Sequence, residues 1–438
     1  MDRHRSGIRG CLLILAMALL VPSQAACRNR ALEQNGSSDS DWVLYEGQTI
    51  DEPNDDVVLA GSILSPVSGQ ADTVFKVGAE RVELWLPVLK DKRVGVLVNH
   101  SSMVGNIHLL DTLLALGVDV RKIFAPEHGF RGDADAGARI DDQFDTRTGL
   151  PVVSLYGNTK EPSAEQMADL DVVVFDIQDV GVRFFTYISS MHYMMEACAE
   201  HGVSMVIFDR PNPNGDYIDG PILRNEFRSF VGMHPIPIVH GLTVGELALM
   251  INGQGWLRAG IKCDLIIVPA VAYTHSMRYE LPVKPSPNLP NGLSIRLYPS
   301  LCLFEGTEVS VGRGTEHPFQ VIGFPDRTYG SFSFVPKAIP GMDTKPLHMG
   351  KRCYGIDLRT TEDLDHRFTL QYLIRFWELS GRSENFISRR RFFNQLVGTD
   401  RLATQIMEGR SEEEIRASWK AELDEYKAMR IKYLIYPD

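Results

Sequence analysis

The chain has 438 residues, of which 44% are apolar and 23% are charged, and its formal net charge at pH 7 is −11. This length allows one large domain or two domains with a substantial core. The acidic balance and the lack of a basic block argue against a nucleic-acid partner, so a carboxylate-bearing ligand would need locally placed arginine or lysine.

The N-terminus has the pattern of an export signal, which we place over residues 1–26. Arginines precede the apolar run CLLILAMALLV, which is too short for an ordinary transmembrane helix. Small residues before Cys27 favour its lipidation, although Gln24 stands where a lipobox usually has leucine. Cleavage after Ala25 or Ala26 into a soluble exported protein is the alternative. We expect a periplasmic or membrane-anchored lipoprotein that meets a membrane only through a lipid on Cys27.

A polar tether and lead-in over 27–79 precede a region in which strand and helix patterns alternate up to about residue 275. Most strand candidates are continuous apolar runs, which are typical of a parallel sheet buried on both faces. They cover 94–100, 121–128, 151–157, 171–179, 203–211, 235–241 and 264–270, with helical patterns at 106–117, 163–170, 186–202 and 243–256. This alternation predicts an α/β fold with a doubly wound, mostly parallel sheet over 80–285.

The remainder, 286–438, has a different character and is predicted as a smaller α+β domain. The proline-rich run 283–307 is expected to be irregular, and short strands follow at 319–325 and 354–360. The end of the chain carries helical patterns.

The cysteines show neither a C-x-x-C pair nor the spacing of a zinc site. Cys198, Cys263 and Cys302 lie in apolar runs. We predict them to be buried free thiols, even in an oxidising compartment.

Polar residues collect where the predicted strands end. The endings are Asn99-His100, Glu127-His128, Tyr156-Gly157, Asp176 with Gln178 and Asp179, Asp209-Arg210, and His240-Gly241. Because open parallel sheets bind ligands outside the carboxyl ends of their strands, these endings together predict a site at one sheet edge.

Several chemistries lack their sequence motif. There is no G-x-G-x-x-G after the first strand, no P-loop and no G-x-S-x-G elbow. The side chains of His128, Asp133, Asp135, Asp176 and His240 are potential metal ligands, but their spacing matches neither an EF-hand nor a zinc site. We expect no required metal or cofactor.

Carboxylate chemistry remains, and Glu127 is its best candidate. It follows the apolar residues 123–126, where burial would disfavour the charged form and keep a proton on the acid. Glycoside hydrolysis needs such a proton donor. Asp176, Asp179 and Asp209 are candidates for the second polar role, and capping of a helix or turn is the alternative for each. Gly129 would let the chain turn away after Glu127.

At these residues the sequence resembles the bacterial exo-β-N-acetylmuramidases of the NamZ type. The matching runs include FAPEHGFRGDADAG, DVVVFDIQDVGVRFFTYISSM, DRPNPNG, HGLTVGELA, PSPNLPN, LYPSLCLFEGT and SVGRGTEHPFQVIG. They cover about residues 80–325 in order, and the C-terminal third matches more loosely. The resemblance implies a Rossmann-like catalytic domain, an auxiliary domain, a cleft between them, and release of N-acetylmuramic acid from the non-reducing end of peptidoglycan fragments. It also implies that the catalytic glutamate is the one in Glu127-His128-Gly129.

The lactyl carboxylate of muramic acid calls for a cation, which Arg131, Arg183, Arg210, Lys284 or Arg313 offers. The prolines of PSPNLPN fix an extended loop that presents Ser286 and Asn288. The predicted catalytic residues are Glu127 and Asp176. The predicted substrate-binding residues are His128, Arg131, Gln178, Asp179, Arg183, Asp209, Arg210, His240, Ser286, Asn288 and Arg313.

Alternatives remain open. The second carboxylate acts as nucleophile or base, or the substrate's own 2-acetamido group attacks with an Asp, Asn or Tyr orienting it. A non-catalytic muropeptide- or sugar-binding lipoprotein and a metal-dependent hydrolase of another bond are the competing functions.

Overall fold

The computed structural model describes residues 42–46, 61–66, 74–127, 129–130, 143–157, 159–360 and 365–438. The predicted export signal, Cys27, His128 and Arg131 lie outside these residues, as does most of the predicted tether. Within the described residues, no helix has both the length and the apolar character needed to cross a membrane.

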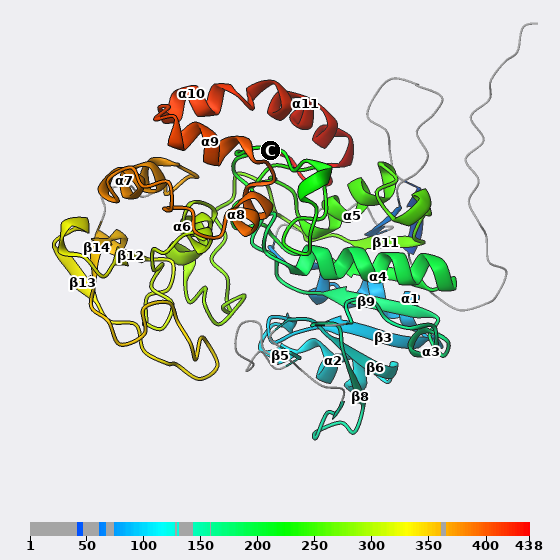
Figure 1. Cartoon of the computed structure of the whole chain (residues 1–438). Coiled ribbons are helices and arrows are strands. Elements are labelled where there is room, and N and C mark those ends of the chain that lie inside the picture. Colours follow the sequence, from blue (N-terminus) through cyan, green and yellow to red (C-terminus); the bar gives the residue numbers. More distant parts are fainter. Residues whose placement is uncertain are drawn as a thin grey trace, which may run out of the picture. The chain divides into compact units, whose positions relative to one another are not determined.

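A nine-stranded sheet organises the first part of the described chain (Figure 1). Its order is β1-β2-β11-β10-β9-β3-β6-β8-β7, in which the strands from β2 to β8 run parallel and β1 and β7 add antiparallel edges. The bounds are β1 Trp42–Glu46, β2 Ser62–Pro66, β3 Arg93–Val98, β6 Asp119–Ala125, β7 Gln143–Phe144, β8 Pro151–Ser154, β9 Val172–Asp176, β10 Ser204–Phe208 and β11 Leu265–Val268. A short hairpin, β4 Met103–Val104 and β5 Ile107–His108, follows β3.

Helices cover both faces of this sheet. Alternate residues of each strand point to opposite faces, so one strand contributes side chains to two apolar clusters. Val94, Val96 and Val98 of β3 pack in one cluster with α1 (Val82–Leu89) and α2 (Leu109–Ala115). Leu97 packs in the other cluster with α3 (Ala164–Met167), α4 (Tyr187–His201) and α5 (Val244–Gly253). From β3 the chain continues to β6 and β8 on one side, and it then returns to β9 and β10 on the other side of β3. The predicted doubly wound α/β fold is therefore confirmed.

One predicted strand is wrong. Residues 235–241 form no strand, and Val239 makes only isolated bridges to Val182 and Asp219. Pro235 and Pro237 lack the N–H that a ladder requires, which prevents this run from joining the sheet. The place beside β11 is taken instead by β2, which sequence analysis did not predict.

The second part has a small antiparallel sheet, ordered β12-β14-β13, and a set of helices. The strands are β12 Val321–Phe324, β13 Phe332–Phe334 and β14 Cys353–Asp357. The helices are α6 Gly292–Leu301, α7 Gln371–Leu379, α8 Arg390–Val397, α9 Arg401–Met407, α10 Glu412–Ala417 and α11 Lys420–Arg430. The expected smaller α+β region is therefore present, whereas the division of the chain at residue 286 stays a prediction.

The run 283–307, predicted as irregular, contains α6. Asn291 and Ser294 form a capping box at its start. Pro299 lies inside the helix and cannot donate to the carbonyl of Ile295. The Asn214 amide nitrogen donates to that carbonyl at 3.3 Å instead, so a side chain from the first part supports the helix.

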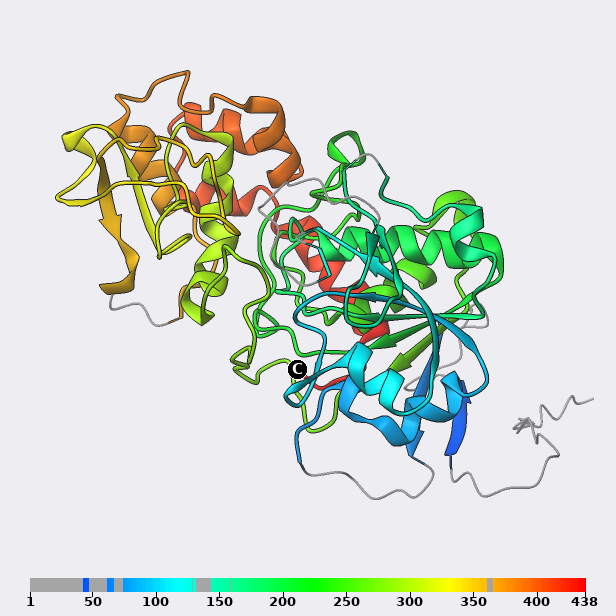
Figure 2. The same ribbon diagram turned by 90° about the horizontal axis from the view of Figure 1, so that it is seen from below.

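The C-terminal segment returns to the α/β part, and Figure 2 shows α11 beside it. The Tyr426 hydroxyl donates to the His240 carbonyl at 2.7 Å, and Arg430 donates to the Gly241 carbonyl. The segment that failed to form a strand is held in place by these contacts.

Candidate active site

Glu127 lies just beyond β6, at the carboxyl edge of the sheet, and is half-buried. The Gly129 N–H donates to the Pro126 carbonyl at 3.0 Å, which closes a tight turn around Glu127. Gly129 has a φ of 76°, a left-handed conformation that side chains disfavour. The predicted turn after Glu127 is thus present, and it needs the glycine.

Hydroxyl groups surround the Glu127 carboxylate. Thr186, at the start of α4, donates to Oε2 at 2.9 Å. The Tyr156 hydroxyl also hydrogen-bonds to Glu127, and burial followed by the nearby negative charge raises the pKa of Tyr156. The same two causes raise the pKa of Tyr187, which lies fully buried beside Glu127 and Asn99. Both phenols therefore keep their protons at neutral pH.

A pocket opens beside Glu127 and contains about 460 Å³ that no protein atom fills, open solvent included. Many of the residues that line it are aromatic. The lining consists of Glu127, Phe184, Phe185, Thr186, Tyr187, Ser286, Asn288, Leu289, Tyr298, Arg313 and Phe319. Of the predicted site residues, Glu127, Ser286, Asn288 and Arg313 meet here, and both parts of the chain contribute.

Arg313 is the cation among the described residues that line this pocket. Its Nε donates to Glu305 Oε1 at 2.6 Å, and its guanidinium lies 5.1 Å from the Phe319 ring centroid. Gly312 and Gly314 on either side have φ values of 79° and 76°. A Cβ on Gly314 would lie 2.4 Å from Pro346, so only a glycine lets the backbone pass this close to that residue.

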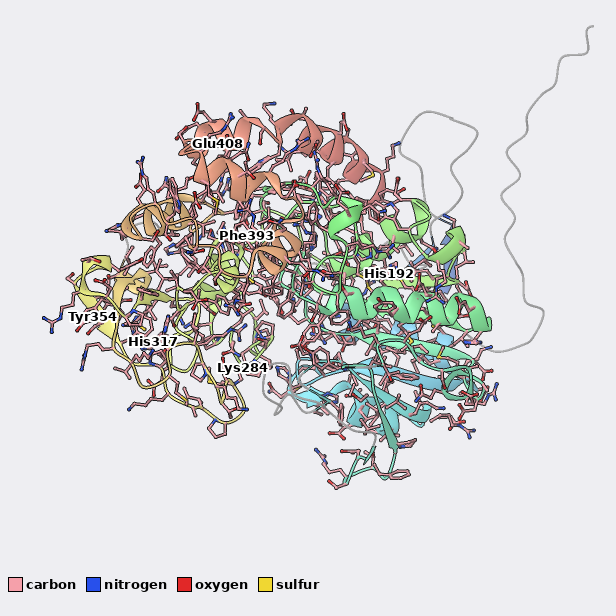
Figure 3. All side chains as sticks on the ribbon, viewed as in Figure 1. His192, Lys284, His317, Tyr354, Phe393 and Glu408 are labelled. Carbon is pink, nitrogen blue, oxygen red and sulfur yellow. The ribbon has the colours of Figure 1, made fainter. Side chains whose placement is uncertain are left out.

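The loop before α6 forms a polar wall of the pocket. Ser286 Oγ accepts from the Asn288 N–H at 3.3 Å, and the Asn288 amide nitrogen donates to the Met342 carbonyl at 3.1 Å. Asn288 is 2% exposed, and its Oδ1 has no partner among the described residues. This oxygen is a ready acceptor for a ligand N–H or O–H. The backbone carbonyl of Lys284, a residue labelled in Figure 3, accepts a hydrogen bond from His100 Nε2 at 2.8 Å.

Asp176 and Arg210 do not line this pocket. They form a buried two-point ion pair, with Arg210 Nε and Nη2 at 2.5 and 2.8 Å from the two Asp176 oxygens. Arg210 also donates to the Met103 carbonyl at 2.8 Å. Each of the two side chains is therefore the hydrogen-bonding partner of the other, where β9 and β10 end.

Asp209 and His240 are also buried away from the pocket. Asp209 accepts from the Thr243 and Tyr436 hydroxyls, both at 2.7 Å, and from the Gly245 N–H at 2.9 Å, so it caps α5. Burial raises the pKa of Asp209 to about 6. His240 Nδ1 accepts from the Leu242 N–H at 3.2 Å.

Gln178, Asp179 and Arg183 organise the loop between β9 and α4. Gln178 donates to the carbonyls of Asp179 and Pro211. Asp179 Oδ2 accepts from the Gly181 N–H and lies 3.6 Å from His240 Nε2. Arg183 is fully buried, and burial lowers its pKa to about 9. It donates to the carbonyls of Pro221, Ile236, Leu396 and Val397, and so joins the two parts of the chain.

Sequence analysis missed the aromatic lining and the Thr186 hydroxyl. The predicted helix at 186–202 includes Thr186 and Tyr187, and no role was predicted for Phe184 and Phe185. A cluster of aromatic residues directly after a polar strand end was the available signal. The predicted thiols Cys198, Cys263 and Cys302 are buried and free, as is Cys353. In the described part of the chain, no three His, Cys, Asp or Glu side chains cluster in a way that suits a metal ion.

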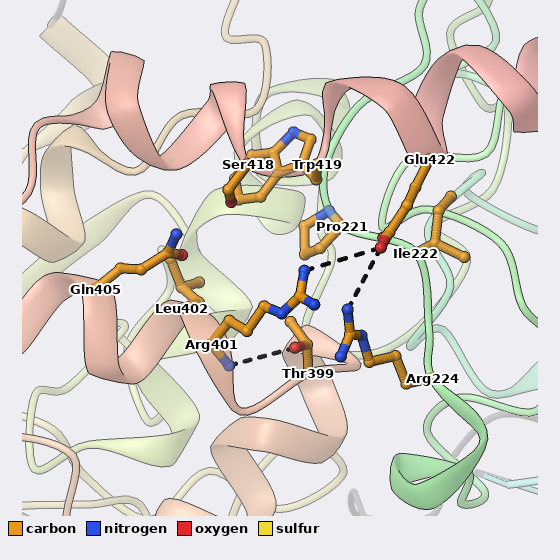
Figure 4. Close-up of a pocket in the computed structure, with 10 residues that line it drawn as sticks. All are labelled: Pro221, Ile222, Arg224, Thr399, Arg401, Leu402, Gln405, Ser418, Trp419 and Glu422. Atoms are coloured by element: carbon orange, nitrogen blue, oxygen red, sulfur yellow. Dashed lines mark hydrogen bonds and ion pairs between the residues drawn. The ribbon is translucent and has the colours of Figure 1, made fainter.

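Another small pocket lies where the C-terminal helices meet the segment around Pro221 (Figure 4). Glu422 of α11 lies 3.4 Å from Arg224 and 3.9 Å from Arg401, so opposite charges meet across it. We assign this pocket to packing between α9, α11 and that segment.

The comparisons with known proteins agree with this geometry. A family model described as the N-terminal part of the exo-β-N-acetylmuramidase NamZ matches residues 94–292, and the C-terminal model matches residues 296–436. Fold, pocket and matches define an α/β glycoside hydrolase with a second, smaller region. The chain belongs to the NamZ exo-β-N-acetylmuramidase family.

One curated relative is the peptidoglycan β-N-acetylmuramidase NamZ of Bacillus subtilis (strain 168), which is 38% identical over 376 residues, or 80% of this chain and 88% of that protein. Two crystal structures of DUF1343 family proteins from Bacteroides fragilis are also similar. One is 46% identical with a TM-score of 0.78 and covers 83% of this chain and 99% of its own. The other is 27% identical with a TM-score of 0.70, covering 83% and 100%.

Proposed function

We propose that this chain is an exo-acting glycosidase that releases N-acetylmuramic acid from the non-reducing end of peptidoglycan fragments, with Glu127 as general acid. The family and the Bacillus subtilis relative support the activity. The observation that carries the assignment to Glu127 is its carboxylate at an aromatic pocket, held by the hydroxyls of Thr186 and Tyr156.

The two hydroxyls suit an acid that loses its proton during the reaction. Glu127 would donate its proton to the glycosidic oxygen as the bond to the sugar breaks. The bonds from Thr186 and Tyr156 then strengthen on the carboxylate that forms. Interactions that strengthen toward the transition state are those that accelerate the chemical step.

The second catalytic group is proposed to come from the substrate. Among the described residues that line the pocket, Glu127 is the one carboxylate, and Asp176 is engaged by Arg210. We therefore favour attack by the 2-acetamido group, with Asn288 or Tyr187 orienting it. This route retains the anomeric configuration, so NMR of the first-formed sugar should show the β-anomer. An α-anomer would contradict it.

Arg313 is proposed to receive the lactyl carboxylate of muramic acid. It lines the pocket with a side chain that is 24% exposed, and Glu305 fixes its orientation through Nε. Arginine offers a planar fork to a carboxylate. Arg313→Gln should raise KM for muramic acid glycosides and leave kcat close to that of wild type.

Export is proposed from the sequence pattern of residues 1–26, with a lipid on Cys27. Metabolic labelling with a radioactive fatty acid should label the wild-type protein and not Cys27→Ala. Labelling of both proteins or of neither would contradict the lipid.

The activity itself is tested by digesting defined muropeptides and identifying the released sugar by mass spectrometry. We expect free N-acetylmuramic acid from substrates that carry it at the non-reducing end, and none from those that carry N-acetylglucosamine there. Binding without release would instead favour a muropeptide-binding protein. Release of a stem peptide that stops on chelation would favour a metal-dependent amide hydrolase.

A further inference from the structure

A second groove is lined by Tyr193, Phe230 and Trp256 among others, and the described residues that line it do not line the Glu127 pocket. It contains about 1530 Å³ that no protein atom fills, open solvent included, which makes it much larger than the first pocket. The groove therefore offers more space to a ligand than the pocket beside Glu127 does.

Helix α4 connects the two. Thr186, Ser189 and Tyr193 are three and four residues apart, so they lie on one face of the helix. Thr186 donates to Glu127, Ser189 Oγ donates to the Phe230 carbonyl at 2.8 Å, and Tyr193 lines the groove. A rise of 1.5 Å per residue separates Thr186 from Tyr193 by about 10 Å along the axis, a span longer than one sugar residue.

Aromatic rings make the same connection across the surface. Tyr156, which hydrogen-bonds to Glu127, has its ring centroid 6.2 Å from that of Phe230. Phe230 and Tyr193 have centroids 6.4 Å apart and planes only 20° apart. Phe230 stands in a tight turn closed by paired bonds between Ser229 and Gly232. Aromatic side chains of this kind offer a large apolar contact surface to a ligand.

Cations border the groove. Lys160 Nζ lies 4.5 Å from the Phe230 ring centroid, and Arg228 Nη2 lies 3.2 Å from His192 Nε2 on α4 (Figure 3). Within the described residues, neither cation has a carboxylate partner. Arg258, in contrast, pairs with Glu161, Glu196 and Glu200. The charges named around the groove therefore balance as a whole, and the positive charge available to an anionic group is local to Arg228 and Lys160.

We propose that this groove binds the leaving part of the substrate, with sugar rings stacked on Phe230 and Tyr193 and a carboxylate of that part near Arg228. This inference rests on the proposed function and extends it to the glycan beyond the scissile bond. The carboxylate belongs either to the lactyl group of the next muramic acid or to a stem peptide.

The test compares a disaccharide that begins with N-acetylmuramic acid with a peptide-free tetrasaccharide that begins in the same way. Wild-type kcat/KM should be higher for the tetrasaccharide. Phe230→Ala should lower it roughly 5- to 10-fold on the tetrasaccharide, through KM, and by a smaller factor on the disaccharide, whose leaving part is a single sugar. Phe230→Leu, which keeps apolar bulk without the ring, should behave alike, and Tyr354→Ala on the distant sheet of β14 is the matched control.

Arg228→Gln locates the carboxylate. A lower kcat/KM on the peptide-free tetrasaccharide identifies the lactyl group, and a loss confined to peptide-bearing substrates identifies the peptide; either outcome supports the groove. If kcat/KM of Arg228→Gln is unchanged on both kinds of substrate, the proposed contact between Arg228 and a carboxylate is overturned. If the wild-type enzyme cleaves the disaccharide and the tetrasaccharide with equal kcat/KM, and the Phe230 variants keep the wild-type values, the inference about the groove is wrong. The proposed function would be unaffected by that result. If wild type cleaves neither, both fall.

Discussion

Two polar clusters at the same sheet edge show how differently similar sequence patterns are used. Beyond β6, Glu127 is half-buried, contacts hydroxyls and lines a pocket. At the end of β9 and just after β10, Asp176 and Arg210 are buried and form an ion pair with a shortest distance of 2.5 Å. Each is a charged group after an apolar strand. An available carboxylate can do chemistry, whereas a buried ion pair fixes the geometry of the loops around it.

The largest expected effect comes from removing the available carboxylate. Glu127→Gln keeps the shape of the side chain but cannot donate a proton, and kcat should fall about 10²–10⁴-fold. Thermal unfolding should stay close to that of wild type. The exposed Glu316→Gln serves as the matched control and should keep full activity. A Glu127→Gln enzyme with more than about a tenth of the wild-type rate would contradict the role of Glu127.

Breaking the ion pair should affect stability instead. Arg210→Met leaves Asp176 buried without its partner, which should lower the free energy of unfolding by about 3–5 kcal/mol. Denaturant unfolding measures this loss. The folded fraction should keep kcat within about three-fold of wild type. Unchanged stability together with lost activity would show that Arg210 acts on the substrate.

The Thr186 hydroxyl is predicted to have an intermediate effect on catalysis. Thr186→Val removes the donor to Glu127 with little change in volume, and kcat should fall roughly ten-fold, as expected for a hydrogen bond to a charged group. Thr186→Ser restores the hydroxyl and should recover most of the rate. If valine and serine behave alike, the hydroxyl has no role in positioning Glu127.

The effect of Asp209 is on stability, and it depends on pH. Its pKa is about 6 when folded and ~3.9 when unfolded, so between these values the folded state binds more protons. Stability contributed by this group is therefore lost as pH rises from about 4 to about 6. The melting temperature of Asp209→Asn, relative to wild type, should rise across that window, with kcat unchanged. A constant difference would mean that Asp209 does not titrate there.

The sheet and most of its strands could be predicted because apolar runs and intervening helices are local patterns. The strand beside β11 could not, since β2 is short and lies far from β11 in sequence. Pro235 and Pro237 were visible in the predicted strand at 235–241, and their missing N–H groups should have excluded it.

The site was predictable only in part. The motif around Glu127 and the loop with Ser286 and Asn288 were recognisable from the family resemblance. Which strand-end charges pair with one another was not predictable, because the pairing of Arg210 with Asp176 depends on how β9 and β10 align across the sheet. For the same reason Arg183 resembled a ligand-binding cation in sequence, although it donates to four backbone carbonyls.

The most direct test of the contrast between the two clusters is the rate of Glu127→Gln and Asp176→Asn on the same muramic acid glycoside, expressed per folded molecule. We predict that Glu127→Gln retains less than about a hundredth of the wild-type rate and that Asp176→Asn stays near it, with a lower melting temperature. An active Glu127→Gln beside a folded but inactive Asp176→Asn would contradict the account.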